Sequence, residues 1–146
     1  MRRWEYIIIH HSLTADGREV SWNAIRNWHT GVTNRSPYKW LDIGYHFGIE
    51  KIGTRYETLL GRSLLHSGAH CKEQNMNKVG IGICLVGNFD LVSPSSLQLT
   101  QLISLVQTLQ DIYIIPKEKV LGHREIASYK SCPGKLFNMD EFRRRL

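Results

Sequence analysis

The run from Val79 to Val86 is apolar at odd and even positions alike. Successive side chains of a β-strand point to opposite faces of the sheet, so a strand that is apolar throughout must be covered on both faces. The run is therefore typical of a central strand with helices on each side. A second apolar, β-branched run, Tyr6 to His10, predicts another buried strand.

A helix is expected between Ser21 and Gly31. The Ser21 hydroxyl can cap the first turn, and the backbone freedom of glycine suits Gly31 to the helix end. Trp22 and Ile25 recur on one face, which is expected to pack against the core. A last short helix is expected from Asp140 to Arg145.

The longest helix is expected to open at Ser93-Pro94. Proline suits the first helical turn, and Ser95 with Gln98 resembles a capping box. Apolar residues then recur three and four positions apart, as on the core-facing side of a helix. These residues are Leu99, Leu102, Ile103, Val106 and Leu109.

Two further strands, Tyr45 to Ile49 and Tyr56 to Leu60, are expected to form a hairpin around Lys51-Ile52-Gly53-Thr54. Val120-Leu121 predicts one more short strand. Strands and helices alternate unevenly along the chain. The expected architecture is therefore an α/β domain with a central mixed β-sheet flanked by helices.

The length of 146 residues and the hydrophobic content of 42% fit one domain spanning residues 1–146. The formal charge of +6 favours a polyanionic partner such as cell-wall polymer, nucleic acid or acidic lipid. No segment approaches the roughly 18 apolar residues of a membrane span, and the N-terminus lacks the pattern of a signal peptide. We therefore expect synthesis in the cytoplasm and no insertion into a membrane.

Glycines in the central apolar run do not indicate a dinucleotide site. Gly80, Gly82 and Gly87 are not followed directly by a helix that could receive a phosphate. Close approach of neighbouring groups to a crowded strand explains them better.

Metal-binding side chains occur in two distant segments. His10 and His11 end the first buried strand, and His123 and Cys132 lie nine positions apart in a loop-rich stretch. Cysteine occurs three times, an odd number that suggests no disulfide framework and leaves a thiol free for a metal. Imidazole and thiolate together suit zinc, and three protein ligands leave one tetrahedral position for water.

Four segments occur in a fixed order: Ile8 to Ser12, Trp40 to Phe47, Ile81 to Phe89, and His123 through Cys132-Pro133-Gly134. Together they resemble the type 2 N-acetylmuramoyl-L-alanine amidases. That family includes amidase-type phage lysozymes and the peptidoglycan recognition proteins of animals. The resemblance extends from about Tyr6 to Gly134, and four segments in order are more specific than any single one.

The resemblance implies one zinc ion per chain, held by His10, His123 and Cys132 in a cleft at the edge of the sheet. It favours His10 over His11 because the ligand of the family directly follows the apolar strand. The neighbouring histidine remains the alternative ligand.

The resemblance also implies roles for residues that do not bind the metal. Tyr45 and Lys130 occupy the positions of catalytic residues, and His70 lies where the family's substrate-binding wall is expected. Compared with phage relatives, the loop from His123 to Lys130 is one residue longer, and the stretch from Asn75 to Ile81 is about two residues longer.

The function implied is zinc-dependent hydrolysis of the amide bond between N-acetylmuramic acid and L-alanine. The expected substrate is peptidoglycan or a muropeptide, and the enzyme is expected to be a monomer. It would act on the cell wall after release, as a prophage lysin does, or on cytoplasmic muropeptides. A non-catalytic peptidoglycan-binding module is the alternative, but Cys132 favours the enzyme. No nucleic-acid partner is expected, because the chain carries no recognised zinc-finger, helix-turn-helix or RNP motif.

Overall fold

The computed structural model describes residues 2–14, 21–32 and 36–146. Within these residues, five strands form one sheet in the order β3-β2-β4-β1-β5. Strands β2, β4, β1 and β5 run parallel to one another, and β3 is antiparallel to β2, so the sheet is mixed, as the sequence predicts. The strands are β1 (Tyr6–His11), β2 (Phe47–Ile52), β3 (Arg55–Leu60), β4 (Gly80–Leu85) and β5 (Val120–Gly122).

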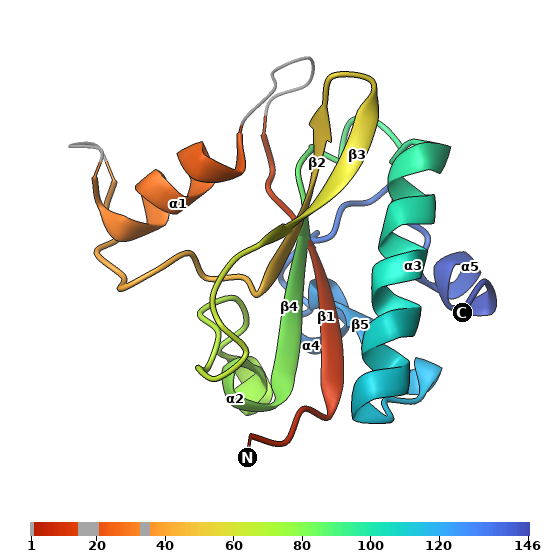
Figure 1. Ribbon diagram of the computed structural model, residues 1–146. Coiled ribbons are helices and arrows are strands. Elements are labelled where there is room, and N and C mark those ends of the chain that lie inside the picture. The colour runs from red at the N-terminus through yellow and green to blue at the C-terminus, as the bar shows by residue number, and fades with distance from the viewer. Residues whose placement is uncertain (1, 15–20, 33–35) are drawn as a thin grey trace.

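Helices cover both faces of the sheet. In Figure 1, α3 and α5 lie on one side of the strands, and α1 and α2 lie on the other. The helices are α1 (Trp22–Thr30), α2 (Met76–Val79), α3 (Ser96–Tyr113), α4 (His123–Ile126) and α5 (Met139–Arg144), with 3-10 turns at η1 (Glu73–Asn75) and η2 (Lys117–Lys119). In the described part of the chain, no helix is long and apolar enough to cross a membrane.

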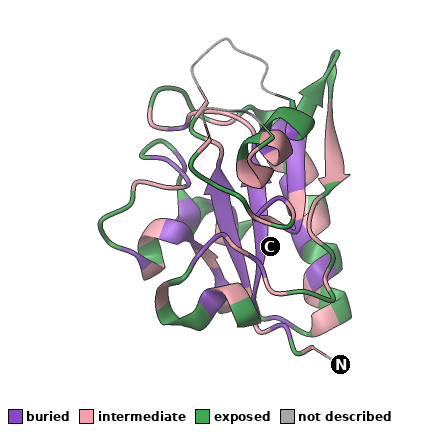
Figure 2. Cartoon of the chain, turned by 90° about the vertical axis from the view of Figure 1, so that its left-hand side faces the viewer, coloured by how far each residue is buried: buried purple, intermediate pink, exposed green. Residues whose placement is uncertain are grey.

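The central strand β4 is buried at every residue, which confirms the interpretation of its apolar run. Figure 2 shows the central strands buried, whereas the tip of the β2–β3 hairpin is exposed. On the α3 side, Leu102, Val106 and Leu109 pack into the main core together with Phe142 of α5. On the opposite face, smaller apolar clusters form around Trp22 and around Ile8.

The predicted ends of α1 are confirmed. The Ser21 hydroxyl accepts a hydrogen bond from the Ala24 backbone N–H at 3.1 Å, and Gly31 ends the helix with a left-handed φ of 72°. Trp22 is buried beneath the helix, where its indole N–H donates to the Leu60 carbonyl at 2.9 Å.

The predicted start of the long helix is wrong by two residues. Helix α3 begins at Ser96 with Ser95 as its N-cap, so Pro94 precedes the cap instead of occupying the first turn. The capping box is half formed. The Ser95 hydroxyl accepts from the Gln98 backbone N–H, but the Gln98 side chain donates to the Val86 carbonyl at 3.2 Å. Burial of Gln98 against the sheet therefore outweighs the reciprocal cap.

Candidate metal centre and active site

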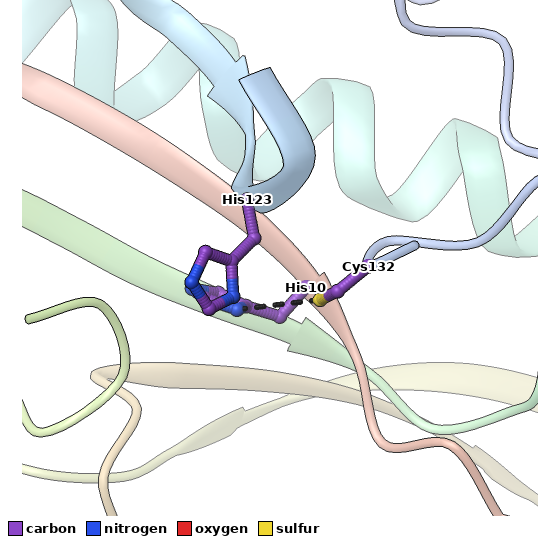
Figure 3. A group of neighbouring side chains, drawn as sticks. All are labelled: His10, His123 and Cys132. Atoms are coloured by element: carbon purple, nitrogen blue, oxygen red, sulfur yellow. Dashed lines mark hydrogen bonds between the residues drawn. The ribbon is translucent and has the colours of Figure 1, made fainter. Parts of the chain in front are cut away.

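Three side chains with metal-binding atoms meet at the carboxyl ends of β1 and β5 (Figure 3). His10 is the penultimate residue of β1, His123 begins α4 directly after β5, and Cys132 lies in the following loop. Their ligand atoms all lie within 4.8 Å of one another, and His10 Nδ1 is 3.5 Å from Cys132 Sγ. Parallel strands end at the same edge of a sheet, so this topology joins segments more than a hundred residues apart.

The spacing of this group fits a zinc ion. Bond lengths of about 2.3 Å to sulfur and about 2.0 Å to nitrogen, at a tetrahedral angle, place the two ligand atoms about 3.6 Å apart. The His10–Cys132 distance is close to this value. Two imidazoles and one thiol also match the soft, nitrogen-and-sulfur donor sets that zinc prefers.

Strand geometry distinguishes His10 from His11. Neighbouring residues of β1 point to opposite faces, so His10 shares a face with Ile8, and His11 faces the α3 side. There His11 Nδ1 accepts a hydrogen bond from the Phe89 backbone N–H at 3.1 Å. In this arrangement only His10 is directed toward His123 and Cys132.

His70 lies behind His10 and is only 9% exposed. Its Nε2 is 3.1 Å from the Gly80 carbonyl oxygen, and its Nδ1 is 2.9 Å from His10 Nε2. A carbonyl oxygen can only accept, so His70 Nε2 carries the proton and His70 Nδ1 accepts from His10 Nε2–H. This relay leaves His10 Nδ1 unprotonated and free for a metal. These contacts indicate a supporting role for His70, and its contact with substrate stays a prediction.

Glycine provides the space for the His70 ring. A Cβ at Gly82 would lie 2.5 Å from the ring, and one at Gly68 would lie 2.3 Å from it. Both distances are far below van der Waals contact. Gly82 thus serves the close approach that the sequence indicated for the central strand.

His123 contacts a carboxylate that the sequence did not single out. His123 Nε2 is 3.4 Å from Glu73 Oε2, and the Tyr129 hydroxyl donates to the other oxygen of Glu73. The Cys71 thiol also donates to Glu73, at 3.6 Å. The hydrogen bond from Tyr129 is the largest of the effects that lower the pKa of Glu73 to about 2. Cys71, Glu73 and His123 form a second group of closely spaced potential ligands.

Arg124 fixes the loop that carries Cys132. Its backbone N–H donates to the Cys132 carbonyl at 2.7 Å, and its guanidinium donates to the carbonyls of Gly134 and Phe137. Glu125, by contrast, accepts from the Gly122 N–H at 2.7 Å and pairs with Arg143 at 2.8 Å. The adjacent Glu125 therefore forms a salt bridge and contacts neither predicted histidine ligand.

Burial sets the protonation states of the group. Desolvation is the largest of the effects that hold the pKa of His10 well below 6.5, and desolvation also lowers the pKa of His123. Burial raises the pKa of the Cys132 thiol to about 12. Neutral imidazoles are ready to bind a metal, whereas the thiol requires a cation nearby to lose its proton at neutral pH.

Tyr45 lies beside His10, with ring centroids 5.2 Å apart. Desolvation raises its pKa well above 10, so it remains a phenol that can donate a hydrogen bond. The Arg62 guanidinium orders this segment by donating to the carbonyls of Asp42, Ile43 and Ser67 at 2.9 to 3.0 Å.

Lys130 is exposed, and its Nζ lies 5.5 Å from the centroid of the Tyr129 ring. Its positive charge contributes to lowering the pKa of His10 and of His123, and it offsets part of the rise in the pKa of Cys132. The catalytic role that the resemblance implies for Lys130 stays a prediction.

Glu73 and Arg62 were missed because neither lies in a recognisable pattern. Glu73 is fifty residues from His123 in the sequence, and a single carboxylate in a polar segment carries no signal of such a contact. The two side chains meet only in the folded chain, where η1 carries Glu73 and α4 begins with His123.

Solved structures with a similar fold include amidases and peptidoglycan recognition proteins. The N-acetylmuramoyl-L-alanine amidase LysC from Clostridium intestinale aligns over 99% of this chain and 85% of its own, with a TM-score of 0.80 and 27% identity. Drosophila PGRP-LB aligns over 94% of this chain and 79% of its own, with a TM-score of 0.72 and 29% identity. The fold is thus that of bacterial amidases and animal peptidoglycan recognition proteins.

Sequence comparison identifies the family. Residues 1–135 match the family described as N-acetylmuramoyl-L-alanine amidase. The endolysin of Enterobacteria phage T3 is 34% identical over 134 residues, covering 88% of this chain and 80% of the relative. The endolysin of Escherichia phage T7 is 33% identical over 132 residues, covering 87% and 78%. The chain belongs to the type 2 N-acetylmuramoyl-L-alanine amidase family, and this membership supports amidase activity on peptidoglycan.

Proposed function

We propose that the protein is a zinc-dependent amidase that hydrolyses the bond between N-acetylmuramic acid and L-alanine, with His10, His123 and Cys132 as the metal ligands. The observation that carries this proposal is that donor atoms of three residues, from two distant segments, lie at distances that suit one tetrahedral ion. Similarity to phage endolysins supports peptidoglycan as the substrate.

The proposed chemistry combines one bound ion with two protein groups. A zinc ion in such a site supplies a water acidified to a pKa of about 7 and an electrophile for the scissile carbonyl. The neutral phenol of Tyr45 donates a hydrogen bond to the carbonyl oxygen as negative charge develops there. The ammonium of Lys130 stabilises the same charge.

A binding module without turnover is the second candidate function. A mutant of Drosophila PGRP-LB has been solved in complex with tracheal cytotoxin, so a protein of this fold binds that ligand. The presence of Cys132 next to His10 favours the enzyme, because a thiolate completes the donor set of a catalytic zinc site.

The test uses purified protein, isolated cell walls and the variant Cys132→Ala. The protein as isolated should carry about one zinc per chain, and digestion should release peptides with L-alanine as a new amino terminus. Cys132→Ala should lose most of the zinc and the activity, since only two of the three ligands remain. New reducing sugar ends would instead indicate a glycosidase, and cell-wall binding without any new terminus would indicate the binding module.

A further inference from the structure

We propose that Glu73 is a positioning residue of the metal site, accepting the Nε2 proton of His123 so that Nδ1 of the same ring is directed at the metal. The inference rests on the proposed function, because it assigns a supporting role beside the proposed zinc ligands. Neither the sequence motifs nor the family resemblance assigns any role to Glu73.

The orientation of His123 leads to this role. Figure 3 shows one ring nitrogen of His123 facing His10 and Cys132 while the other points away. Nε2 is the nitrogen in contact with Glu73, at 3.4 Å, so Nδ1 is the nitrogen available to the group. An imidazole that donates from one nitrogen presents a lone pair on the other, and a carboxylate acceptor makes that lone pair more basic.

The Glu73 carboxylate is held from several sides. Tyr129 donates to one of its oxygens, and the Cys71 thiol and His123 share the other. The side chain of Glu73 is 19% exposed and that of His123 is 10% exposed. A contact of 3.4 Å is long for a hydrogen bond, but a carboxylate fixed in this way has little freedom to move away from the ring.

The backbone after Glu73 is also unusual. Gln74 and Asn75 both have a positive backbone φ, 50° and 63°, which residues other than glycine rarely adopt. The Asn77 side chain accepts from the backbone N–H groups of His70 and Cys71, at 2.7 and 2.8 Å, on the other side of the same turn. The turn therefore connects the segment behind His10 to the carboxylate behind His123.

The two predicted histidine ligands thus have different supports. His10 donates to a neutral imidazole, His70, which passes the hydrogen bond on to a backbone carbonyl. His123 donates to a carboxylate. Since the carboxylate adds charge as well as orientation, Glu73 should contribute to metal affinity and to the ligand field at the metal.

The experiment compares four proteins: wild type, Glu73→Gln, Tyr129→Phe and Glu125→Gln. Zinc affinity is measured at pH 7 by competition with a chromophoric chelator. The absorption spectrum of the Co²⁺-loaded protein and the Tm of the metal-free protein are recorded on the same preparations. Glu125→Gln is the matched control, because Glu125 lies on the same helix as His123 but pairs with Arg143.

Glu73→Gln should weaken zinc binding roughly 10- to 100-fold and alter the Co²⁺ spectrum, since supporting residues of metal-bound histidines have effects of this size. Tyr129→Phe, at an exposed side chain that should not affect folding, should weaken binding a few-fold. Glu125→Gln should lower the Tm and leave zinc affinity unchanged.

Wild-type zinc affinity and an unchanged Co²⁺ spectrum in Glu73→Gln would overturn the inference while leaving the proposed function intact. If Glu73→Gln does not fold, Tyr129→Phe is the test of the inference. Wild-type zinc affinity in Tyr129→Phe would then overturn the positioning role of Glu73. A wild-type protein that binds no zinc overturns both the inference and the proposed function.

Discussion

At the scale of single residues, the proposed metal ligands and the proposed catalytic residues are different side chains. Tyr45 contacts the ring of His10 but offers an oxygen that burial keeps protonated. Lys130 is exposed on the loop that also carries Cys132. Neither residue belongs to the group of closely spaced ligand atoms, so each can be removed without removing a ligand.

Tyr45→Phe and Lys130→Ala should therefore keep zinc and fold while losing turnover. If each group acts on the transition state more than on the bound substrate, kcat and kcat/KM should fall together, by roughly 100-fold or more, with little change in KM. Zinc content, Tm and cell-wall hydrolysis measured on the same preparations test this. Near-normal turnover in both variants would remove the assigned roles and leave the metal site untouched.

His46 makes a residue-scale prediction about pH. It is 1% exposed, with Nδ1 accepting from the Gly82 N–H at 3.0 Å and Nε2 donating to the His66 carbonyl at 3.2 Å. Burial lowers its pKa from 6.5 to about 4. The unfolded chain therefore binds a proton at about pH 5 that the folded protein does not, so stability is present above about pH 6.5 and is lost as pH falls toward about 4.

The contribution of His46 to this loss should be about 2 kcal/mol between about pH 7 and about pH 5. His46→Asn keeps an acceptor near the Gly82 N–H but does not titrate. Urea unfolding at the two pH values should show a smaller loss of stability in the variant than in the wild type. Equal losses in the two proteins would mean that His46 is not held neutral by its burial.

At the scale of elements, the ends of helices are set by individual side chains. Helix α3 is the longest helix of the described chain and packs along β2 and β3. Its first turn depends on the Ser95 hydroxyl, which accepts from the Gln98 N–H at 3.1 Å. The first N–H groups of a helix lack partners within the helix, so a cap of this kind stabilises the whole element.

Ser95→Ala should destabilise the protein by about 1 kcal/mol. For a chain of this length, that corresponds to a fall in Tm of roughly 2–4 °C. The same substitution at Ser96, the first residue of the helix, leaves the cap in place and serves as the control. Thermal unfolding of the two variants should separate them, and equal effects would show that the cap contributes nothing specific.

At the scale of the whole molecule, the candidate metal site would add a cross-link where the pairing of β1 with β5 already brings distant parts of the chain together. His10 belongs to β1, His123 follows β5, and Cys132 lies in the loop that Arg124 holds against α4. An ion bound by these three side chains would cross-link residues that are far apart in the sequence. The unfolded chain offers no such preformed site. Metal binding should therefore appear as stability of the entire domain.

Removal of the metal by a chelator should lower the Tm by about 10 °C. Free zinc at about 1,000 times its Kd stabilises a folded protein by about 4 kcal/mol, and each kcal/mol shifts the Tm by roughly 2–4 °C at this size. Zinc added back should restore the Tm in the wild type and leave Cys132→Ala unchanged. Identical melting with and without chelator would contradict a structural contribution of the metal.

The sequence by itself determined the layered architecture. Apolar side chains at every position of Val79 to Val86 require cover on both faces, and Ser21 and Gly31 define the ends of α1 because capping depends on neighbouring residues. The family, too, could be recognised from four segments in order. These features are local or depend only on the order of segments, so they can be read without coordinates.

Only the tertiary structure decided which side chains meet. The alternation of β1 turns His10 toward Cys132 and His11 toward Phe89, a difference that the sequence indicated only through the family resemblance. Burial placed His70 behind His10, a contact that the sequence did not indicate. The fold also brought Glu73 into contact with His123, fifty positions away in the sequence. Contacts of this kind depend on distances between segments, and the composition of neither segment encodes them.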